Sequence, residues 1–276
     1  MGSDSVALKR PIGVFDSGIG GLSILQALRS ELPHEDFVYL SDSAHAPYGE
    51  RDDAHVLARS RRITNHLLSE HHIKALVIAC NTATAAAIHV LREEHPALPF
   101  IGIEPALKPA AALSRTRRIG VMGTRGTLGS AKFAALLASV SDQADFVCQA
   151  CDGLADAIER DDTAKTRALC DQYIKAMGPF GAQVGQIDTL VLGCTHYTFA
   201  IDHLKQLVPG NVGLIDNGAS VARQTRRVLP TLSADDSAAR CLLFSTGEPT
   251  SLQRAAQRWL TEPATAVAES TAATPR

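Results

Sequence analysis

The chain has 276 residues, of which 45% are hydrophobic and 20% are charged, and its formal net charge at pH 7 is −2. This composition is typical of a folded, soluble protein with one large domain or two closely packed ones. Because the positive charge is scattered and balanced, neither nucleic acid nor an anionic membrane surface is expected as a partner.

The sequence contains no apolar run close to the roughly 20 residues that span a bilayer. Its first ten residues, MGSDSVALKR, lack the apolar core of a secretion signal. We therefore expect a cytoplasmic protein with no membrane partner. In a reducing compartment the six cysteines are expected to be free thiols.

Short apolar runs alternate with longer helical patterns along the chain. The first part of the sequence predicts strands over 11–17, 37–43 and 75–82, and helices over 18–32, 53–72 and 83–95. Further strands are expected over 100–105, 118–124, 144–150 and 189–195, with helices between them. This alternation favours parallel sheets of the doubly wound α/β kind.

Two pairs of similar segments indicate an internal repeat. LVIACNTAT (76–84) and LVLGCTHYT (190–198) both place a cysteine, Cys80 or Cys194, after a strand-like run. IGVFDSGIGGLS (12–23) and IGVMGTRGTLGS (119–130) are offset by nearly the same distance along the chain. We predict two similar α/β halves with mainly parallel sheets, related by an approximate twofold axis. Since ligands of open α/β sheets bind beyond the carboxyl ends of strands, both cysteines should border one cleft.

A pair of facing thiols suits a two-base proton transfer. One group removes a proton from a stereocentre, and the other returns a proton on the opposite face. Neither role needs a metal or a cofactor. A single cysteine at the end of a buried strand is most often an inert core residue. Here a cysteine occurs at this position in both halves, each time followed by polar residues, and this favours the catalytic interpretation. The polar residues are Asn81, Thr82, Thr195 and His196.

The glycine-rich segment DSGIGGLS (16–23) has Ser23 where a dinucleotide-binding fingerprint would need a glycine. A Rossmann cofactor is therefore not expected. Glycines ahead of a helix offer backbone N–H groups to a carboxylate or phosphate, and a tight turn explains the same glycines equally well. The turn alone does not account for Asp16, an acid directly after a buried strand.

The CQAC segment (148–151) is a rival motif, since a CxxC pair can be redox-active or form half of a zinc site. A zinc site usually has a second ligand pair, and no second CxxC or HxxxH pair follows in the chain. Cys148 lies within the apolar run FVC, so we predict a core cysteine. The histidines of SEHHIK (69–74) are predicted to lie on a solvated face.

Four segments, FDSGIGGLSIL, SDSAHAPYGE, ACNTATAAAI and LGCTHYTF, together resemble the glutamate racemase family of the aspartate/glutamate racemase superfamily. The resemblance covers about residues 11–250. It implies a cofactor-independent isomerase without a metal, which interconverts L- and D-glutamate. The D-isomer is needed for bacterial peptidoglycan. The resemblance also implies a small-molecule substrate as partner and admits a homodimer.

Carried over to this sequence, the resemblance makes Cys80 the acid/base group for D-glutamate and Cys194 that for L-glutamate. It makes Asp16 and His196 the polar partners of these two cysteines. It also implies a catalytic role for Glu159, which lies eight residues after Cys151; the family often has proline directly after this cysteine, where this chain has Asp152. The residues implied to hold the substrate are Asp16, Ser17, Tyr48, Gly49, Asn81, Thr82, Thr124, Thr127, Thr195 and His196.

The repeat and the resemblance together predict a first domain of residues 11–104 plus 216–260 and a second domain of residues 105–215. Residues 1–10 and 261–276 are predicted to be flexible ends. Two alternatives stay open. A related enzyme could act on aspartate or another small acid, with the choice made by the polar residues of SDSAHAPYG. A non-catalytic binding protein on the same fold would not require both cysteines.

Overall fold

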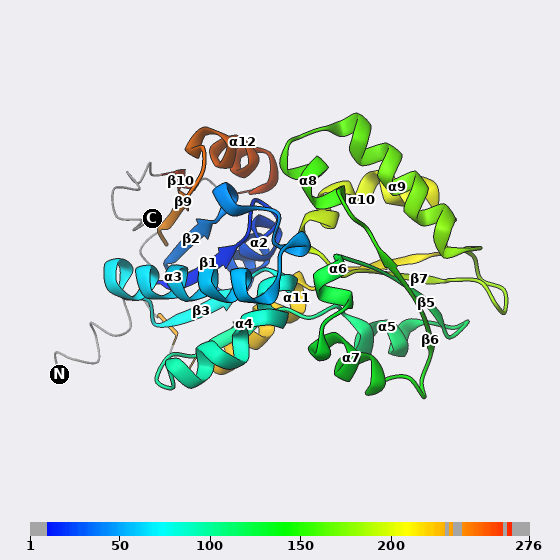
Figure 1. Cartoon of the computed structure of the whole chain (residues 1–276), viewed down its shortest axis with the longest axis horizontal. Helices are drawn as coiled ribbons and strands as arrows, with labels where there is room; N and C mark the ends of the chain where they lie inside the picture. Colours follow the sequence, from blue (N-terminus) through cyan, green and yellow to red (C-terminus); the bar gives the residue numbers. More distant parts are fainter. Residues whose placement is uncertain (1–9, 230–231, 234–238, 262–263, 267–276) are drawn as a thin grey trace.

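The structure of the protein is a computed structural model, and it describes residues 10–229, 232–233, 239–261 and 264–266. Two parallel β-sheets, each with its own helices, lie next to each other along the long axis of the molecule (Figure 1). We call the sheet that contains the N-terminal strands, with its helices, the first half, and the other the second half. The predicted α/β class with two halves is confirmed.

The first half has a six-stranded sheet in the order β10-β9-β2-β1-β3-β4, with every pair parallel. Its strands are β1 (Ile12–Asp16), β2 (Phe37–Ser41), β3 (Ala75–Ile78), β4 (Phe100–Gly102), β9 (Cys241–Ser245) and β10 (Thr265–Ala266). Its helices are α2 (Leu22–Glu31), α3 (Asp53–His71), α4 (Asn81–Glu94), α11 (Gly218–Val228) and α12 (Pro249–Trp259). This half therefore combines both ends of the described chain.

The second half has a four-stranded parallel sheet in the order β6-β5-β7-β8. Its strands are β5 (Arg118–Gly123), β6 (Asp145–Ala150), β7 (Thr189–Leu192) and β8 (Gly213–Ile215). Its helices are α5 (Leu107–Leu113), α6 (Arg125–Leu128), α7 (Ala131–Ala138), α8 (Leu154–Glu159), α9 (Thr163–Met177) and α10 (Ile201–Leu207). The order matches β2-β1-β3-β4 of the first half strand for strand, as an internal repeat predicts.

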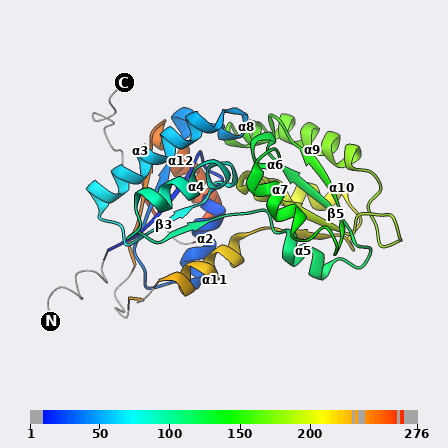
Figure 2. The ribbon, with the colours of Figure 1, turned by 60° about the horizontal axis from the view of Figure 1, so that its bottom comes forward.

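Helices cover both faces of each sheet, although the outer strand β6 of the second half is covered incompletely. In the first half, Val14 and Val77 point into a core shared with α2, α11 and α12, whereas Phe15 and Ile78 point into a core shared with α3 and α4. Figure 2 shows α3 and α11 on opposite sides of this sheet. Side chains alternate between the faces of a strand, so a strand buried on both faces is apolar throughout. This is why the strands were readable as continuous apolar runs.

Several predicted strands are shorter than expected, among them the two that precede the paired cysteines. β3 ends at Ile78, and Asn81 already belongs to the first turn of α4, with Cys80 as the capping residue. β7 ends at Leu192, and a 3-10 helix, η3 (Thr195–Ala200), begins directly after Cys194. Polar side chains at a helix start can accept hydrogen bonds from its unpaired N–H groups, and small ones leave these groups accessible, which explains why the apolar pattern stops here.

The chain passes to the second half between β4 and β5 and returns after β8, because Val221 and Ala222 of α11 pack in the core of the first half. The domain bounds at 104/105 and 215/216 stay a prediction. Thr265–Ala266 pairs with β9, so regular structure continues beyond residue 261. The other residues of the predicted flexible ends, apart from 10, 261 and 264, lie outside the described residues. Among the helices that the structure describes, none has the length and apolarity to cross a membrane.

Candidate active site

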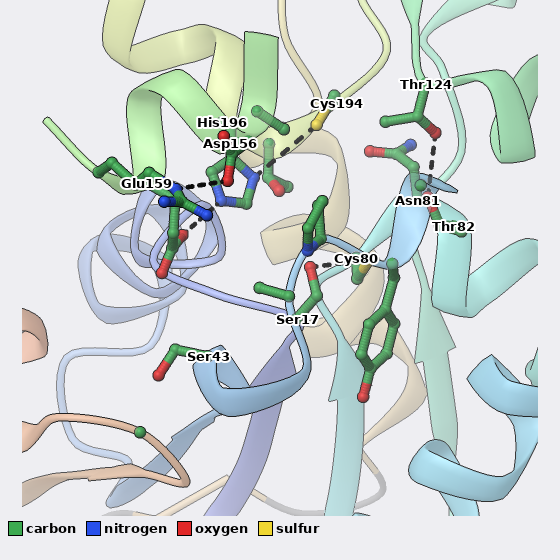
Figure 3. A pocket seen from close by; sticks show the side chains of 18 of the residues that line it. Ser17, Ser43, Cys80, Asn81, Thr82, Thr124, Asp156, Glu159, Cys194 and His196 are labelled. Atoms are coloured by element: carbon green, nitrogen blue, oxygen red, sulfur yellow. Dashed lines mark hydrogen bonds and ion pairs between the residues drawn. The ribbon is translucent and has the colours of Figure 1, made fainter. Parts of the chain in front are cut away.

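A cavity of about 420 Å³ opens between the two halves, within the size range of small-molecule sites. Figure 3 shows side chains from both halves pointing into it. The predicted site residues that line it are Ser17, Tyr48, Gly49, Cys80, Asn81, Thr82, Thr124, Glu159, Cys194, Thr195 and His196. The two remaining predicted residues, Asp16 and Thr127, lie behind this lining and contact it by hydrogen bonds.

Cys80 caps the N-terminus of α4 and is 6% exposed. Its sulfur accepts the N–H of Ala83 at 3.4 Å, and its thiol donates to Oγ of Ser17 at 3.7 Å. Ser17 in turn donates to Oδ1 of Asp16 at 3.0 Å. Burial and the charge of Asp16 raise the pKa of the Cys80 thiol above its ordinary value. These surroundings favour the protonated thiol of Cys80, which can donate a proton.

Cys194 has a different environment in the second half. Its sulfur lies 3.8 Å from Nδ1 of His196, and Nε2 of the same ring lies 2.8 Å from Oε2 of Glu159 (Figure 3). Burial lowers the pKa of His196, but the hydrogen bonds with Cys194 and Glu159 outweigh it and raise this pKa well above its ordinary value. An imidazolium at this position is a counter-charge for a thiolate on Cys194.

Asp16 is fully buried and accepts hydrogen bonds from Ser17 and from Oγ1 of Thr195, each at 3.0 Å. Burial raises the pKa of its carboxyl group, while the charge of His196 lowers it. Thr195 belongs to the second half, so Asp16 joins the two halves beneath the cavity. The predicted contact of Asp16 with Cys80 is indirect, through Ser17, and the structure does not bring its carboxylate to the cavity surface.

The glycines of DSGIGGLS allow the second half to approach the first. A Cβ atom on Gly18 would lie 2.2 Å from Oε2 of Glu159, and one on Gly20 would lie 2.4 Å from Nδ1 of His196. The N–H of Ile19 donates to Oε2 of Glu159 at 2.9 Å. A carboxylate of the second half therefore occupies the N–H of Ile19 in this turn.

Hydroxyl groups of three threonines meet at the boundary of the halves. Oγ1 of Thr82 lies 3.0 Å from that of Thr124 and 3.3 Å from that of Thr127. Beside them, Asn81 is 4% exposed, and neither its amide nitrogen nor its amide oxygen has a partner in the part of the chain that the structure describes. Buried amides are normally paired, so this unpaired donor and acceptor in the cavity wall are available to a ligand.

Tyr48 is buried, and its hydroxyl donates to Asp42. Nine further residues of the lining were not predicted as site residues: Ser43, Ala46, Pro47, Ala155, Asp156, Arg160, Gly247, Glu248 and Ser251. Ser43, Ala46 and Pro47 lie in the SDSAHAPYG segment, whose polar residues were predicted to choose between substrates. The others lie in α8, at its end, in the loop before α12 and in the first turn of α12, where no local motif marks them.

All six cysteines are free thiols. Cys151 and Cys170 are buried in the core of the second half, but Cys148 is exposed. The prediction of a core position for Cys148 is wrong, because β6 is the outer strand of its sheet and is covered incompletely. Within the described ranges, no group of three or more His, Cys, Asp or Glu side chains could hold a metal ion.

One buried thiol from each of two α/β halves, with an acid–hydroxyl chain at one thiol and an imidazole at the other, is an arrangement suited to proton transfer at carbon. The family described as Asp/Glu/Hydantoin racemase matches residues 21–225. The chain belongs to this family of amino-acid racemases.

More specific relatives are glutamate racemases. The chain is 47% identical over 248 residues to glutamate racemase of Pseudomonas paraeruginosa, covering 88% of this chain and 91% of the relative. It matches the crystal structure of glutamate racemase isoform RacE1 from Bacillus anthracis with a TM-score of 0.82 at 30% identity, over 95% of this chain and 98% of that chain. The structure of Escherichia coli glutamate racemase in complex with L-glutamate and the activator UDP-MurNAc-Ala matches with a TM-score of 0.81 at 28% identity. This match covers 94% of this chain and 98% of that chain. The resemblance inferred from the four motifs is confirmed.

Proposed function

We propose that the protein is a cofactor-independent glutamate racemase in which Cys80 and Cys194 exchange protons with opposite faces of the substrate α-carbon. The observation that carries this proposal is the placement of two buried thiols, one from each half, in the wall of a single cavity. A binding protein on this fold would have no need of two thiols there.

In the direction from L- to D-glutamate, the Cys194 thiolate removes the α-proton and the Cys80 thiol gives its proton to the opposite face. The enzyme is left with a neutral Cys194 and a Cys80 thiolate, which is the form that accepts D-glutamate. The raised pKa of Cys80 and the imidazolium beside Cys194 both favour the starting state of the L-to-D direction. The opposite state is reached by proton exchange with water.

The α-proton of an amino acid is far less acidic than a thiol, so the site has to stabilise the developing carbanion. Fixed donors that face the cavity do this most effectively where water is excluded. The free amide of Asn81 and the hydroxyls of Thr82 and Thr124 are suited to hold the substrate carboxylates. Asp16 contributes through Ser17 and Thr195 rather than by contact with the substrate.

Glutamate is favoured over aspartate by the relatives, which are named glutamate racemases at 45–50% identity. The corresponding assay incubates the purified protein with L-glutamate or L-aspartate, without added cofactor, and separates the enantiomers on a chiral column. The proposal predicts D-glutamate and little D-aspartate. Conversion of aspartate alone would move the function to the sister activity.

In the cell, this activity would supply D-glutamate for peptidoglycan synthesis. The cytoplasmic location, the homodimer and the absence of nucleic-acid and membrane partners stay predictions from the sequence and the resemblance. The role of Cys80 as the base for D-glutamate and of Cys194 as the base for L-glutamate is likewise part of this proposal.

A further inference from the structure

Asp42 is a fully buried acid at the end of β2, next to the site but outside its lining. Its carboxylate accepts Nε and Nη2 of Arg59 at 2.9 and 2.8 Å, Oγ1 of Thr246 at 2.8 Å and the hydroxyl of Tyr48. Arg59, from α3, is only 7% exposed. The pair is bidentate, which fixes both side chains in one geometry.

A buried ion pair is weak evidence of a stabilising role, because well-packed apolar residues often serve stability equally well. What it supplies is a defined arrangement of the segments that it joins. Here these segments are the end of β2, α3, the 3-10 helix η2 (Tyr48–Glu50) and the loop after β9. Tyr48 lines the cavity, as does Gly247, the residue after Thr246. Asp42 therefore connects two parts of the cavity wall, the η2 segment and the loop after β9, through hydrogen bonds outside the lining.

Two routes lead from Asp42 to Cys80. The first runs through Tyr48, whose side chain lies in the same buried core cluster as Cys80. The second runs through the backbone: the N–H of Asp42 donates to the carbonyl oxygen of Asp16 at 2.9 Å, and the Asp16 carboxylate accepts from Ser17, the partner of the Cys80 thiol. Both routes end at the thiol of the first half.

We propose that the Asp42–Arg59 pair, together with the Tyr48 hydroxyl, is a positioning unit for Cys80. It sets where this thiol stands relative to the substrate without contacting the substrate itself. The inference rests on the proposed function, since it concerns the proton transfer at Cys80.

A positioning role at Cys80 affects the two proton-transfer steps unequally, which a purely structural role would not do. Enantiomers have equal free energies in water, so any variant changes kcat/KM by the same factor in both directions. A slower step at Cys80 shows instead in the deuterium isotope effects. Removal of the α-deuteron of D-glutamate by Cys80 becomes more rate-limiting, and its removal from L-glutamate by Cys194 becomes less so.

The test uses Arg59→Lys, which keeps the positive charge and loses the bidentate geometry. The matched control is Arg61→Lys in the same helix, whose ion pair with Glu94 is exposed. We expect Arg59→Lys to lower kcat/KM about tenfold, the scale of one charge-assisted hydrogen bond. The isotope effect on kcat/KM should rise with D-[2-²H]glutamate and fall with L-[2-²H]glutamate. Arg61→Lys should match the wild type in both.

Thr246→Val is the second variant, because it removes one hydrogen bond to Asp42 at nearly constant volume and keeps the ion pair. It should shift both isotope effects in the same directions as Arg59→Lys, by a smaller amount. This variant keeps the test possible if Arg59→Lys does not fold. Isotope effects equal to those of the wild type in the folded variants would overturn the positioning role while leaving the racemase intact. A wild-type protein that does not racemise glutamate would instead overturn the proposed function.

Discussion

Oε2 of Glu159 lies 2.8 Å from Nε2 of His196 and also accepts the backbone N–H of Ile19 at 2.9 Å. One carboxylate oxygen thus holds the imidazole beside Cys194 and fixes it against the glycine turn of the first half. The hydrogen bond and the charge of Glu159 both raise the pKa of His196, so the imidazolium persists to higher pH than in a free histidine.

Glu159→Gln should shift the pH dependence of the reaction. The variant removes the negative charge, so the pKa of His196 falls and the imidazolium is lost at lower pH. The alkaline limb of kcat/KM should move down by about one pH unit, with about a tenfold loss at pH values above the wild-type limb. Asp161→Asn, two residues away in an exposed ion pair with Arg258, is the control and should leave the profile unchanged. An unmoved alkaline limb in Glu159→Gln would argue against an imidazolium role.

Gly20→Ala should reduce activity much more than it alters the fold. The added Cβ would meet Nδ1 of His196 at 2.4 Å and Oγ1 of Thr195 at 2.6 Å, so the two halves could not close to the same distance. We expect kcat/KM to fall about 100-fold, the scale of a displacement near 1 Å at reacting groups, with an unchanged far-UV circular dichroism spectrum. Gly210→Ala, where a Cβ meets nothing within 4 Å, should be fully active. A Gly20→Ala enzyme within threefold of the wild type would refute the close approach.

Asn81→Leu should separate binding from stability. The wild-type amide is buried without a partner in the described structure, and replacing such a group with an apolar one of similar size is neutral or stabilising for the fold. We therefore expect an unchanged or higher Tm, measured by differential scanning calorimetry, and a KM for glutamate raised about tenfold. A lower Tm with an unchanged KM would show that Asn81 serves the fold instead of the substrate.

Trp259→Ala should destabilise the contact between α12 and the catalytic segment of the second half. Trp259, the only tryptophan of the chain, stacks on Phe199 with ring centroids 4.3 Å apart and an angle of 18°. Since the indole is partly buried, its loss should lower the free energy of unfolding by about 1–2 kcal/mol, measured by urea denaturation. Trp259→Phe should retain most of the stacking and lose less than half of that amount. Equal losses in both variants would contradict a stacking contribution.

The sequence carried the local features of the site but not its long-range contacts. Cys80 and Cys194 were predictable because each follows an apolar strand and precedes polar residues, and because the pattern occurs twice. Gly18 and Gly20 were interpreted as a tight turn or an anion-binding helix start. Their role in the approach of the two halves could not be predicted, since the side chains that need the space, Glu159 and His196, lie more than a hundred residues further along. Glu159 was found by the family resemblance alone.

The packing of individual residues against neighbouring strands and helices could not be predicted from the sequence either. Cys148 was predicted to be buried from its apolar neighbours, yet β6 lies at the edge of its sheet, and strand order cannot be read from a local pattern. Asp42 stood in a segment described only as polar. Its role as an acceptor became visible when the fold brought Arg59 and Thr246 to it.

The central claim, proton exchange by Cys80 and Cys194 on opposite faces of one α-carbon, is tested most directly by proton NMR of L-glutamate with the purified protein in D₂O, combined with chiral analysis. The wild type should introduce deuterium at Cα and form D-glutamate without added cofactor. Cys80→Ala and Cys194→Ala should each abolish racemisation, while Cys148→Ala, which removes an exposed thiol, should behave as the wild type. Racemisation at the wild-type rate by either single-thiol variant would contradict the two-base account.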